Sequence, residues 1–512
     1  MYDQSFNAKS FQEIFDIENR KGNNVESRFK IDFSESLAKL NQIKTISEKL
    51  KVELDKDERI KLLKDKSTLK KQRSELIAEV LEKASNKIKK HKIILEEGDD
   101  FGGQSYVLEN NIENFFISKK TQLNINKLYD VKQSSRHSIL NELLVQLEDK
   151  FPKYVLRTDI KKFYESIPQK QLLSKINDDY LLSIQTKEYI TQILKAYREI
   201  TNQPDLNTAK GIPRGVGVSA FLAELFMRKI DNNIRNLDDL VYYCRYVDDI
   251  IIIFIPEKID NDNNPLDKIL NQIKALINEY AGNEFLINEE KTKKYSLTEG
   301  LKNLAFEKQV YLDDVLILKV PILNSKPITF LGYKIGSVNK EHGTTQLGGT
   351  IKTKPSNVFS VDISENKLIK YKTRIKLMFS DFKKKAFPTI KDFKLLEARI
   401  RFLTSNTKLR NSKNCVFVGI YYSNIFVNNF NSLETLDKSL HYHINRSGLD
   451  TSKKNSLKKY SFKDGFIGKK FEIIPLQNRT YLNHNKKKLD SNNSRNKGIL
   501  KHGLAEINSI WK

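Results

Sequence analysis

Residues 240–254 read LVYYCRYVDDIIIIF, two β-rich runs joined by a pair of aspartates. β-Branched and aromatic residues fill both runs and very few residues separate them, which is typical of a tight hairpin. Such a hairpin carries Asp248 and Asp249 at its turn. Acidic pairs at solvated turns are common, and Asp238-Asp239 just upstream is an ordinary one. The pair alone therefore does not indicate a site.

A third acid stands at the end of another β-rich run. Residues 153–157 (KYVLR) predict a strand, and Asp159 follows it where a helix would begin. Two neighbouring strands can then present Asp159 and Asp248 side by side. Phosphoryl transfer between a hydroxyl and a triphosphate needs charge neutralised at the attacking and leaving oxygens, and two carboxylate-bound Mg²⁺ ions do this. The aspartates are therefore candidate metal ligands.

The segment between these acids is a glycine- and proline-rich loop that runs into an amphipathic helix. Residues 211–225 read GIPRGVGVSAFLAEL. Glycine lets the backbone approach a substrate closely, and the first turn of a helix offers free N–H groups. A loop of this kind alone is weak evidence for a substrate site. Its position in the sequence between Asp159 and Asp248 strengthens that interpretation.

In this order the three segments resemble the palm of a reverse transcriptase. Asp159 matches the first palm motif, residues 211–219 match the loop-and-helix motif, and residues 246–249 (YVDD) match the catalytic Tyr-x-Asp-Asp box. Residues 286–293 (LINEEKTK) resemble the segment after the hairpin, and residues 330–333 (FLGY) resemble the primer-grip turn. The resemblance covers residues 105–340, nearly half of the chain.

The resemblance implies a metal site and a sugar contact. Asp159 and Asp248 are expected to hold two Mg²⁺ ions, with Mn²⁺ as an alternative, and Asp249 supports them. Tyr164 matches the aromatic residue that packs beneath the sugar of the incoming nucleotide and excludes a ribose 2′-hydroxyl. A core tyrosine is the alternative for this position.

Further nucleotide-binding candidates follow from the same resemblance. Lys132 and Arg136 are expected to grip the triphosphate from the fingers, and Lys291 to protonate the departing pyrophosphate. Solvated surface positions are the alternative for all three in so lysine-rich a chain. Arg214 and Gly215 are also expected to contact the nucleotide. Arg214 stands where the family usually has Gln, so we expect its contact with the sugar or base to differ from the family's.

Composition limits the other classes of protein. The 512 residues include 89 Lys plus Arg and 64 Asp plus Glu, a net charge of +25, which favours an anionic partner or reflects a composition bias. The longest apolar run, residues 250–255, is too short to span a bilayer, and the N-terminus lacks a signal peptide. Two cysteines exclude a disulfide framework or a cysteine zinc site. We expect a soluble, cytoplasmic protein without a membrane partner.

The predicted fold class is α+β, a right-hand polymerase with helical additions. Residues 1–100 form an N-terminal helical segment, with one long helix or a helical pair over 45–90, and residues 101–345 form the fingers and palm. A helical, thumb-like domain follows over 346–450, and residues 451–512, with 15 Lys plus Arg against 4 acids, form a basic tail. Aromatic residues such as Tyr421 and Tyr422 suit stacking on single-stranded nucleic acid, or else belong to the core.

No RNase H constellation or Cys/His cluster follows residue 345, so the chain resembles the prokaryotic defence-associated and abortive-infection reverse transcriptases, with the type 3 defence enzymes as first choice. The implied function is RNA-directed synthesis of DNA from dNTPs in antiphage defence. The implied partners are an RNA template or non-coding RNA, the DNA product, and a second reverse transcriptase subunit or further copies of the chain. A retron-type enzyme and a silent palm that only binds RNA are the alternatives.

Overall fold

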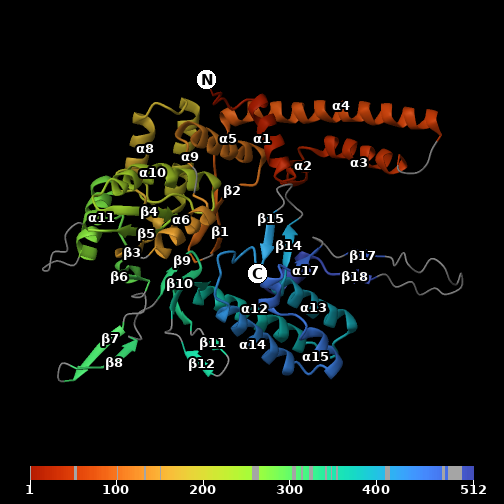
Figure 1. Ribbon diagram of the computed structural model, residues 1–512. Coiled ribbons are helices and arrows are strands. Elements are labelled where there is room, and N and C mark those ends of the chain that lie inside the picture. Colours follow the sequence, from red (N-terminus) through yellow and green to blue (C-terminus); the bar gives the residue numbers. More distant parts are fainter. Residues whose placement is uncertain are drawn as a thin grey trace, which may run out of the picture. The chain divides into compact units, whose positions relative to one another are not determined.

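The computed structural model describes residues 2–50, 55–100, 102–131, 134–149, 151–256, 265–301, 307–312, 315–321, 327–340, 343–346, 349–352, 356–409, 416–474, 479–481 and 499–511 (Figure 1). The chain divides into two compact units. Unit 1 comprises Met1–Leu143 and Pro152–Ser296, and unit 2 comprises Leu144–Phe151 and Leu297–Lys512.

A four-stranded sheet forms the centre of unit 1. Its strand order is β4-β5-β3-β6, with β3 at Lys153–Asp159, β4 at Leu240–Tyr246, β5 at Asp249–Phe254 and β6 at Lys293–Leu301. β5 runs antiparallel to both β3 and β4. β5 is an inner strand, and Ile250 to Ile253 are at most 1% exposed. Because consecutive side chains point to opposite faces, this burial shows that the sheet is covered on both faces at β5. The predicted hairpin and the predicted strand before Asp159 are confirmed.

Unit 1 also contains helices. Those that lie wholly or mainly in it are α1 (Ala8–Arg20), α2 (Val25–Arg28), α3 (Ser34–Lys49), α4 (Lys56–Lys87), η1 (Ile88–Lys90), α5 (Ile112–Tyr129), α6 (Arg136–Glu148), α7 (Phe163–Ser166), α8 (Gln169–Asp178), α9 (Ile184–Ile200), α10 (Gly217–Arg235), α11 (Pro265–Ala281) and η2 (Glu289–Lys291). A hairpin of β1 (Leu95–Asp100) and β2 (Gln104–Leu108) precedes α5. The apolar face of α10 joins the sheet in one core, which includes Leu222, Ile230 and Ile252.

Within the predicted range 45–90 the structure has one long helix, α4, which was one of the two alternatives. It lies alongside α3, which belongs mostly to the residues before that range (Figure 1). The segment before them belongs to the core of unit 1, because Phe11 of α1 stacks on Phe116 of α5 with ring centroids 4.6 Å apart. The N-terminal helices are therefore tied to the polymerase-like region by apolar packing.

Unit 2 combines helices with short sheets. Its helices are α12 (Glu365–Lys383), α13 (Ile390–Thr404), α14 (Asn431–Asn445), α15 (Thr451–Leu457), α16 (Phe462–Ile467), α17 (Leu504–Ile507) and η5 (Asn508–Ile510). One sheet has the order β13-β10-β9, with β9 at Ile328–Phe330, β10 at Tyr333–Lys340 and β13 at Ser356–Ile363. A second has the order β15-β14-β16, with β14 at Asn406–Leu409, β15 at Val416–Gly419 and β16 at Phe471–Glu472.

Three two-stranded ribbons complete unit 2. They are β7 (Glu307–Leu312) with β8 (Val315–Pro321), β11 (Gly343–Gln346) with β12 (Gly349–Lys352), and β17 (Arg479–Tyr481) with β18 (Ile499–Lys501). The turn expected at 330–333 joins β9 to β10, and both Leu331 (φ 44°) and Gly332 (φ 78°) adopt the left-handed conformation of a tight hairpin.

Two further expectations concern the C-terminal half. The predicted helical region, residues 346–450, also contains the strands β12 to β15, which were not predicted from the sequence. The first part of the predicted basic tail is folded, because Leu457 and Phe462 are fully buried. Residues 482–498 of that tail, and Cys415, lie outside the described residues.

Within the described residues, no helix has the length and apolar character needed to cross a membrane. The domain boundaries remain a prediction.

Close packing in unit 2 yields a test of the fold. A Cβ added at Gly465 would lie 1.7 Å from the carbonyl oxygen of Thr404, whereas one added at Gly336 would lie 3.4 Å from its nearest neighbour, on Pro327. We expect Gly465→Ala to lower the free energy of unfolding by about 1–3 kcal/mol through overpacking. Gly336→Ala is the control and should unfold like the unaltered protein. Equal melting temperatures for the two variants would contradict this packing.

Candidate active site

The register of the central sheet brings the acidic residues together. Asp159, the last residue of β3, pairs with Asp249, the first residue of β5. Val247 and Asp248 form the two-residue turn between β4 and β5, and the N–H of Ile160 donates to the carbonyl of Asp248 at 3.2 Å. The backbone therefore fixes Asp248 beside the end of β3, with Asp159 as its neighbour.

The carboxylates at this edge of the sheet repel one another when no cation is bound. Burial raises the pKa of Asp248, and the nearby carboxylates of Asp249 and Asp159 raise it further. Lys291 Nζ donates to Asp159 Oδ2 at 2.7 Å, and Arg157 Nη2 donates to Asp249 Oδ1 at 3.2 Å. The two cations offset part of the repulsion, and Asp248 remains the poorly neutralised carboxylate.

These residues fit a divalent cation. Asp159 is 6% exposed, and its Oδ1 is buried without a hydrogen-bond partner in the described structure. Nowhere in the described residues are three or more His, Cys, Asp or Glu side chains placed to hold a metal ion together, and this includes the three predicted ligands Asp159, Asp248 and Asp249. Mg²⁺ does not need three such ligands, since it commonly takes one or two carboxylates and completes its shell with water and substrate phosphates. Asp159 and Asp248 are suited to that role, and Asp249 is held by Arg157.

A cavity of about 530 Å³ opens beside the acids, within unit 1. Its walls come from the tip of the β1–β2 hairpin, the segment after β3, the glycine- and proline-rich loop, the catalytic-box turn and η2. The lining residues are Gly102, Gly103, Gln104, Asp159, Ile160, Lys161, Lys162, Phe163, Tyr164, Glu165, Arg214, Val247, Asp248, Asn288 and Lys291. The structure thus brings five of the predicted site residues to one cavity: Asp159, Tyr164, Arg214, Asp248 and Lys291.

Tyr164 lies in the cavity wall with its ring partly buried. The ring packs edge-to-face on Phe163 with centroids 5.3 Å apart, and the carbonyl of Tyr164 accepts from the N–H of Ile212 at 2.8 Å. Burial raises the pKa of Tyr164 above its ordinary value, so the phenol is neutral near pH 7. The position suits a contact with a sugar ring, which remains a prediction.

The glycine- and proline-rich loop is anchored to the β1–β2 hairpin. Gly215 has φ 97°, and a Cβ there would lie 2.8 Å from the carbonyl oxygen of Tyr106, so only glycine allows this approach. The close contact is with strand β2, and Gly215 is not among the cavity-lining residues. Arg214 reaches back over the cavity, with Nη1 3.5 Å from the carbonyl of Gly102 and 3.9 Å from Glu165 Oε1.

The remaining candidates are less well placed. Lys132 lies outside the described residues. Arg136 begins α6 and is not among the cavity-lining residues. A role in gripping triphosphate stays a prediction for both. Two cavity lysines that sequence reasoning did not select, Lys161 and Lys162, lie two and three residues after Asp159 and offer positive charge at the cavity wall. Their position close to Asp159 in the sequence was the feature that could have identified them as site residues.

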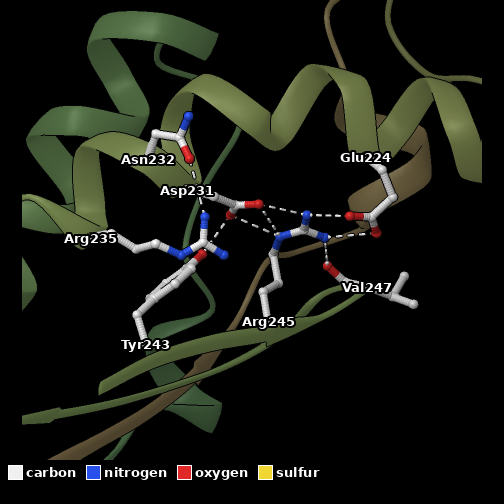
Figure 2. A network of polar contacts seen from close by, with 7 residues as sticks. All are labelled: Glu224, Asp231, Asn232, Arg235, Tyr243, Arg245 and Val247. Atoms are coloured by element: carbon white, nitrogen blue, oxygen red, sulfur yellow. Dashed lines mark hydrogen bonds and ion pairs between the residues drawn. The ribbon is translucent and has the colours of Figure 1, made fainter. Parts of the chain in front are cut away.

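Arg245, two residues before the turn, is the main residue that sequence reasoning missed. Figure 2 shows its guanidinium between two carboxylates of α10, where Nε and Nη2 donate to Asp231 at 2.9 and 2.8 Å and Nη2 donates to Glu224 at 2.7 Å. A further bond, from Nη1 to the carbonyl of Val247 at 2.9 Å, reaches the turn itself. Arg245 is 7% exposed, so its charge depends on these partners.

The bond to Val247 matters because that residue is strained. Val247 has φ 61°, a region that β-branched residues rarely occupy. Arg245 holds the carbonyl of this residue, directly before Asp248, and so stabilises a turn that the sequence disfavours. Glu224 and Asp231 are seven residues apart, two helical turns, and so share one face of α10. That spacing was the signal for a buried cation.

Replacing Arg245 tests its role as a positioning residue. Arg245→Met leaves Asp231 and Glu224 buried without their partner and should lower the free energy of unfolding of unit 1 by about 3–5 kcal/mol. Arg245→Lys keeps the charge but loses the forked geometry. We expect this variant to fold, and to need more Mg²⁺ for any metal-dependent activity because Asp248 is less well held. Arg235→Lys, on the outer part of the same network, is the control (Figure 2). An unchanged Mg²⁺ requirement in Arg245→Lys would contradict this role.

Comparison with known proteins identifies the central region. Residues 105–335 match the family described as reverse transcriptase (RNA-dependent DNA polymerase). No curated protein matches the chain. Similar solved structures include apo telomerase from Candida tropicalis truncated from its C-terminal domain (14% identity, 48% of this chain and 53% of that chain, TM-score 0.29). Another is telomerase from Candida albicans in complex with a fragment of telomeric RNA (12% identity, 72% of this chain and 61% of that chain, TM-score 0.29).

The chain thus spans between about half and two thirds of the length of these structures. The family match covers the three acids, the glycine- and proline-rich loop and the primer-grip turn, and it confirms the predicted fold class, an α+β right-hand polymerase. Residues 105–335 therefore form a reverse transcriptase domain.

Proposed function

We propose that the protein is an RNA-directed DNA polymerase that adds dNTPs to a DNA strand by two-metal phosphoryl transfer. The observation that carries this proposal is that Asp159 and Asp248 line one cavity: the β3–β5 register pairs Asp159 with Asp249, and the N–H of Ile160 donates to the carbonyl of Asp248 in the adjoining turn. One buried carboxylate oxygen of Asp159 has no partner in the described structure. Buried, mutually repelling carboxylates disfavour folding unless a cation is bound, so their presence favours a catalytic role.

The bound ions, Mg²⁺ or Mn²⁺, would supply charge neutralisation at the reacting phosphate. Asp159 and Asp248 would hold them. Tyr164 would support the sugar of the incoming nucleotide, and Arg214 would contact its sugar or base. Lys291 would give the proton from Nζ to the departing pyrophosphate; its hydrogen bond to Asp159 raises its pKa, which keeps that proton in place until the phosphates arrive.

The proposal extends to antiphage defence, with a non-coding RNA and a second reverse transcriptase subunit or further copies as partners. This part is supported by the motif resemblance of the sequence. A retron-type enzyme shares the chemistry and would co-purify with one structured RNA. Sequencing the RNA and DNA bound to the purified protein separates these cases, and loss of phage protection in cells that carry Asp248→Asn would connect synthesis to defence.

Asp248→Asn tests the metal site in two independent ways. The variant should lose incorporation of dNTPs on a primed RNA template, because one ligand charge is removed with little change of shape. Without metal it should be as stable as the unaltered protein or more so, by about 1 kcal/mol, since a buried repelling charge is gone. The Mg²⁺-dependent rise in melting temperature should disappear in the variant.

The control for this variant is Asp238→Asn, which changes an exposed aspartate in the loop between α10 and β4, at the opposite end of β4 from Asp248. It should leave both incorporation and the Mg²⁺ effect unchanged. Normal incorporation by Asp248→Asn would exclude the proposed polymerase site. A silent RNA-binding module would instead show RNA binding without incorporation in the unaltered protein.

Tyr164→Ala tests sugar selection. A ring packed against C2′ excludes a hydroxyl by overlap, so its removal should increase the incorporation of rNTPs relative to dNTPs and slow turnover. Tyr164→Phe keeps the ring and should keep the preference for dNTPs. Primer extension with each nucleotide class measures the ratio. Full discrimination by the alanine variant would make Tyr164 a packing residue only.

A further inference from the structure

One face of a small sheet in unit 2 carries exposed aromatic rings. In the β15-β14-β16 sheet, Lys408 pairs across the strands with Phe417, and Asn406 pairs with Phe471. Because alternate residues of a strand share a face, Lys408, Phe417 and Phe471 lie on one side. Phe417 is 43% exposed and Phe471 is 45% exposed, although both lie on ordered strands.

The opposite face of this sheet packs against helices of unit 2. Leu409 packs into a small core with Leu395 of α13 and Leu504 of α17. Glu472, the carboxylate on the three strands, forms an ion pair with Arg401 of α13. The aromatic face therefore carries no carboxylate from these strands and is not needed for packing against α13.

The rings form a connected platform. Phe417 stacks on Tyr422 with centroids 5.1 Å apart and planes inclined by 26°, and Phe471 meets Phe417 edge-on at 5.9 Å. Tyr422 is 39% exposed. Asn406 fixes the turn that carries Tyr422, since its side-chain Oδ1 accepts from the N–H of Tyr421 at 2.9 Å. The platform is thus held rigid before any ligand arrives.

Positive charge borders the platform. Lys408 Nζ lies 5.9 Å from the ring centre of Phe417, and Lys469 Nζ lies 4.6 Å from that of Tyr421. Lys470, next to Phe471, is exposed. Exposed aromatic rings bordered by lysines and without carboxylates match the chemistry of unpaired bases and the phosphates between them. Protein interfaces are also enriched in aromatic residues, but lysine is depleted from them, so the lysines around these rings favour nucleic acid over a protein partner.

We propose that Phe417, Tyr422 and Phe471, with Lys408 and Lys469, form a binding surface for single-stranded RNA outside the reverse transcriptase domain. The rings stack on unpaired bases and the lysines contact phosphates. The choice of RNA rests on the proposed function, and the stacking surface itself rests on the geometry of unit 2.

Binding of a fluorescently labelled, unstructured RNA to the full chain tests this surface by anisotropy. Phe417→Ala and Phe471→Ala should each weaken binding by roughly 5- to 100-fold, the loss expected for one stacked base. Phe417→Leu keeps an apolar side chain but loses the π face, so it should also bind weakly, whereas Phe417→Trp should retain binding. Phe387→Ala, at a position that is 91% exposed on unit 2, is the control and should bind normally.

The salt dependence of RNA binding distinguishes the contribution of the aromatic rings from that of the lysines. The aromatic variants should keep the slope of log K against log salt, and Lys408→Gln should reduce it by about 0.7. Normal RNA binding by Phe417→Ala and Phe471→Ala would overturn the proposal, as would a loss confined to single-stranded DNA or to self-association of the chain. RNA binding can be measured in the Asp248→Asn background, in which no DNA synthesis is expected. Weaker RNA binding caused by Phe417→Ala would then support the aromatic surface even if the unaltered protein incorporated no dNTP.

Discussion

The burial of one arginine constrains the whole candidate site. The guanidinium of Arg245 sits in the interior, where an unpaired charge is strongly disfavoured, so α10 must place Asp231 and Glu224 around it. The same side chain holds the carbonyl of Val247 and with it the turn that presents Asp248. One buried charge therefore ties the helix, the strand β4 and the catalytic-box turn into a single rigid piece.

The site around this turn contains local features that lower the stability of the folded protein. A β-branched residue adopts a left-handed turn, three carboxylates meet at adjacent strand ends, and Asp159 keeps a buried oxygen without a partner. Lys291 and Arg157 relieve part of the repulsion. Local conflicts held in place by a well-packed surrounding are characteristic of functional sites, and a bound cation would resolve the largest of them.

Much of this arrangement could be predicted from local patterns. The two β-rich runs of residues 240–254 with very few residues between them indicated a hairpin, and the run at 153–157 indicated a strand, so the placing of Asp159 and Asp248 near one another followed. Arg245 could not be assigned in this way, because its partners lie 14 and 21 residues away on a helix. The hairpin tip at Gly102 and Gly103 was not singled out from the sequence, because its place at the cavity depends on a tertiary contact with Arg214. The strands β14 to β16 were missed because two to four residues are too few to show a period.

The central claim is that Asp159 and Asp248 together hold the ions of a polymerase site. The most direct measurement is anomalous X-ray scattering from Mn²⁺ in crystals of the protein with a primed RNA template and an incoming dNTP. The account predicts Mn²⁺ bound to the carboxylates of Asp159 and Asp248 and to the triphosphate, with Tyr164 against the sugar. Ordered nucleotide with Mn²⁺ bound elsewhere, or no Mn²⁺ at these carboxylates, would contradict it.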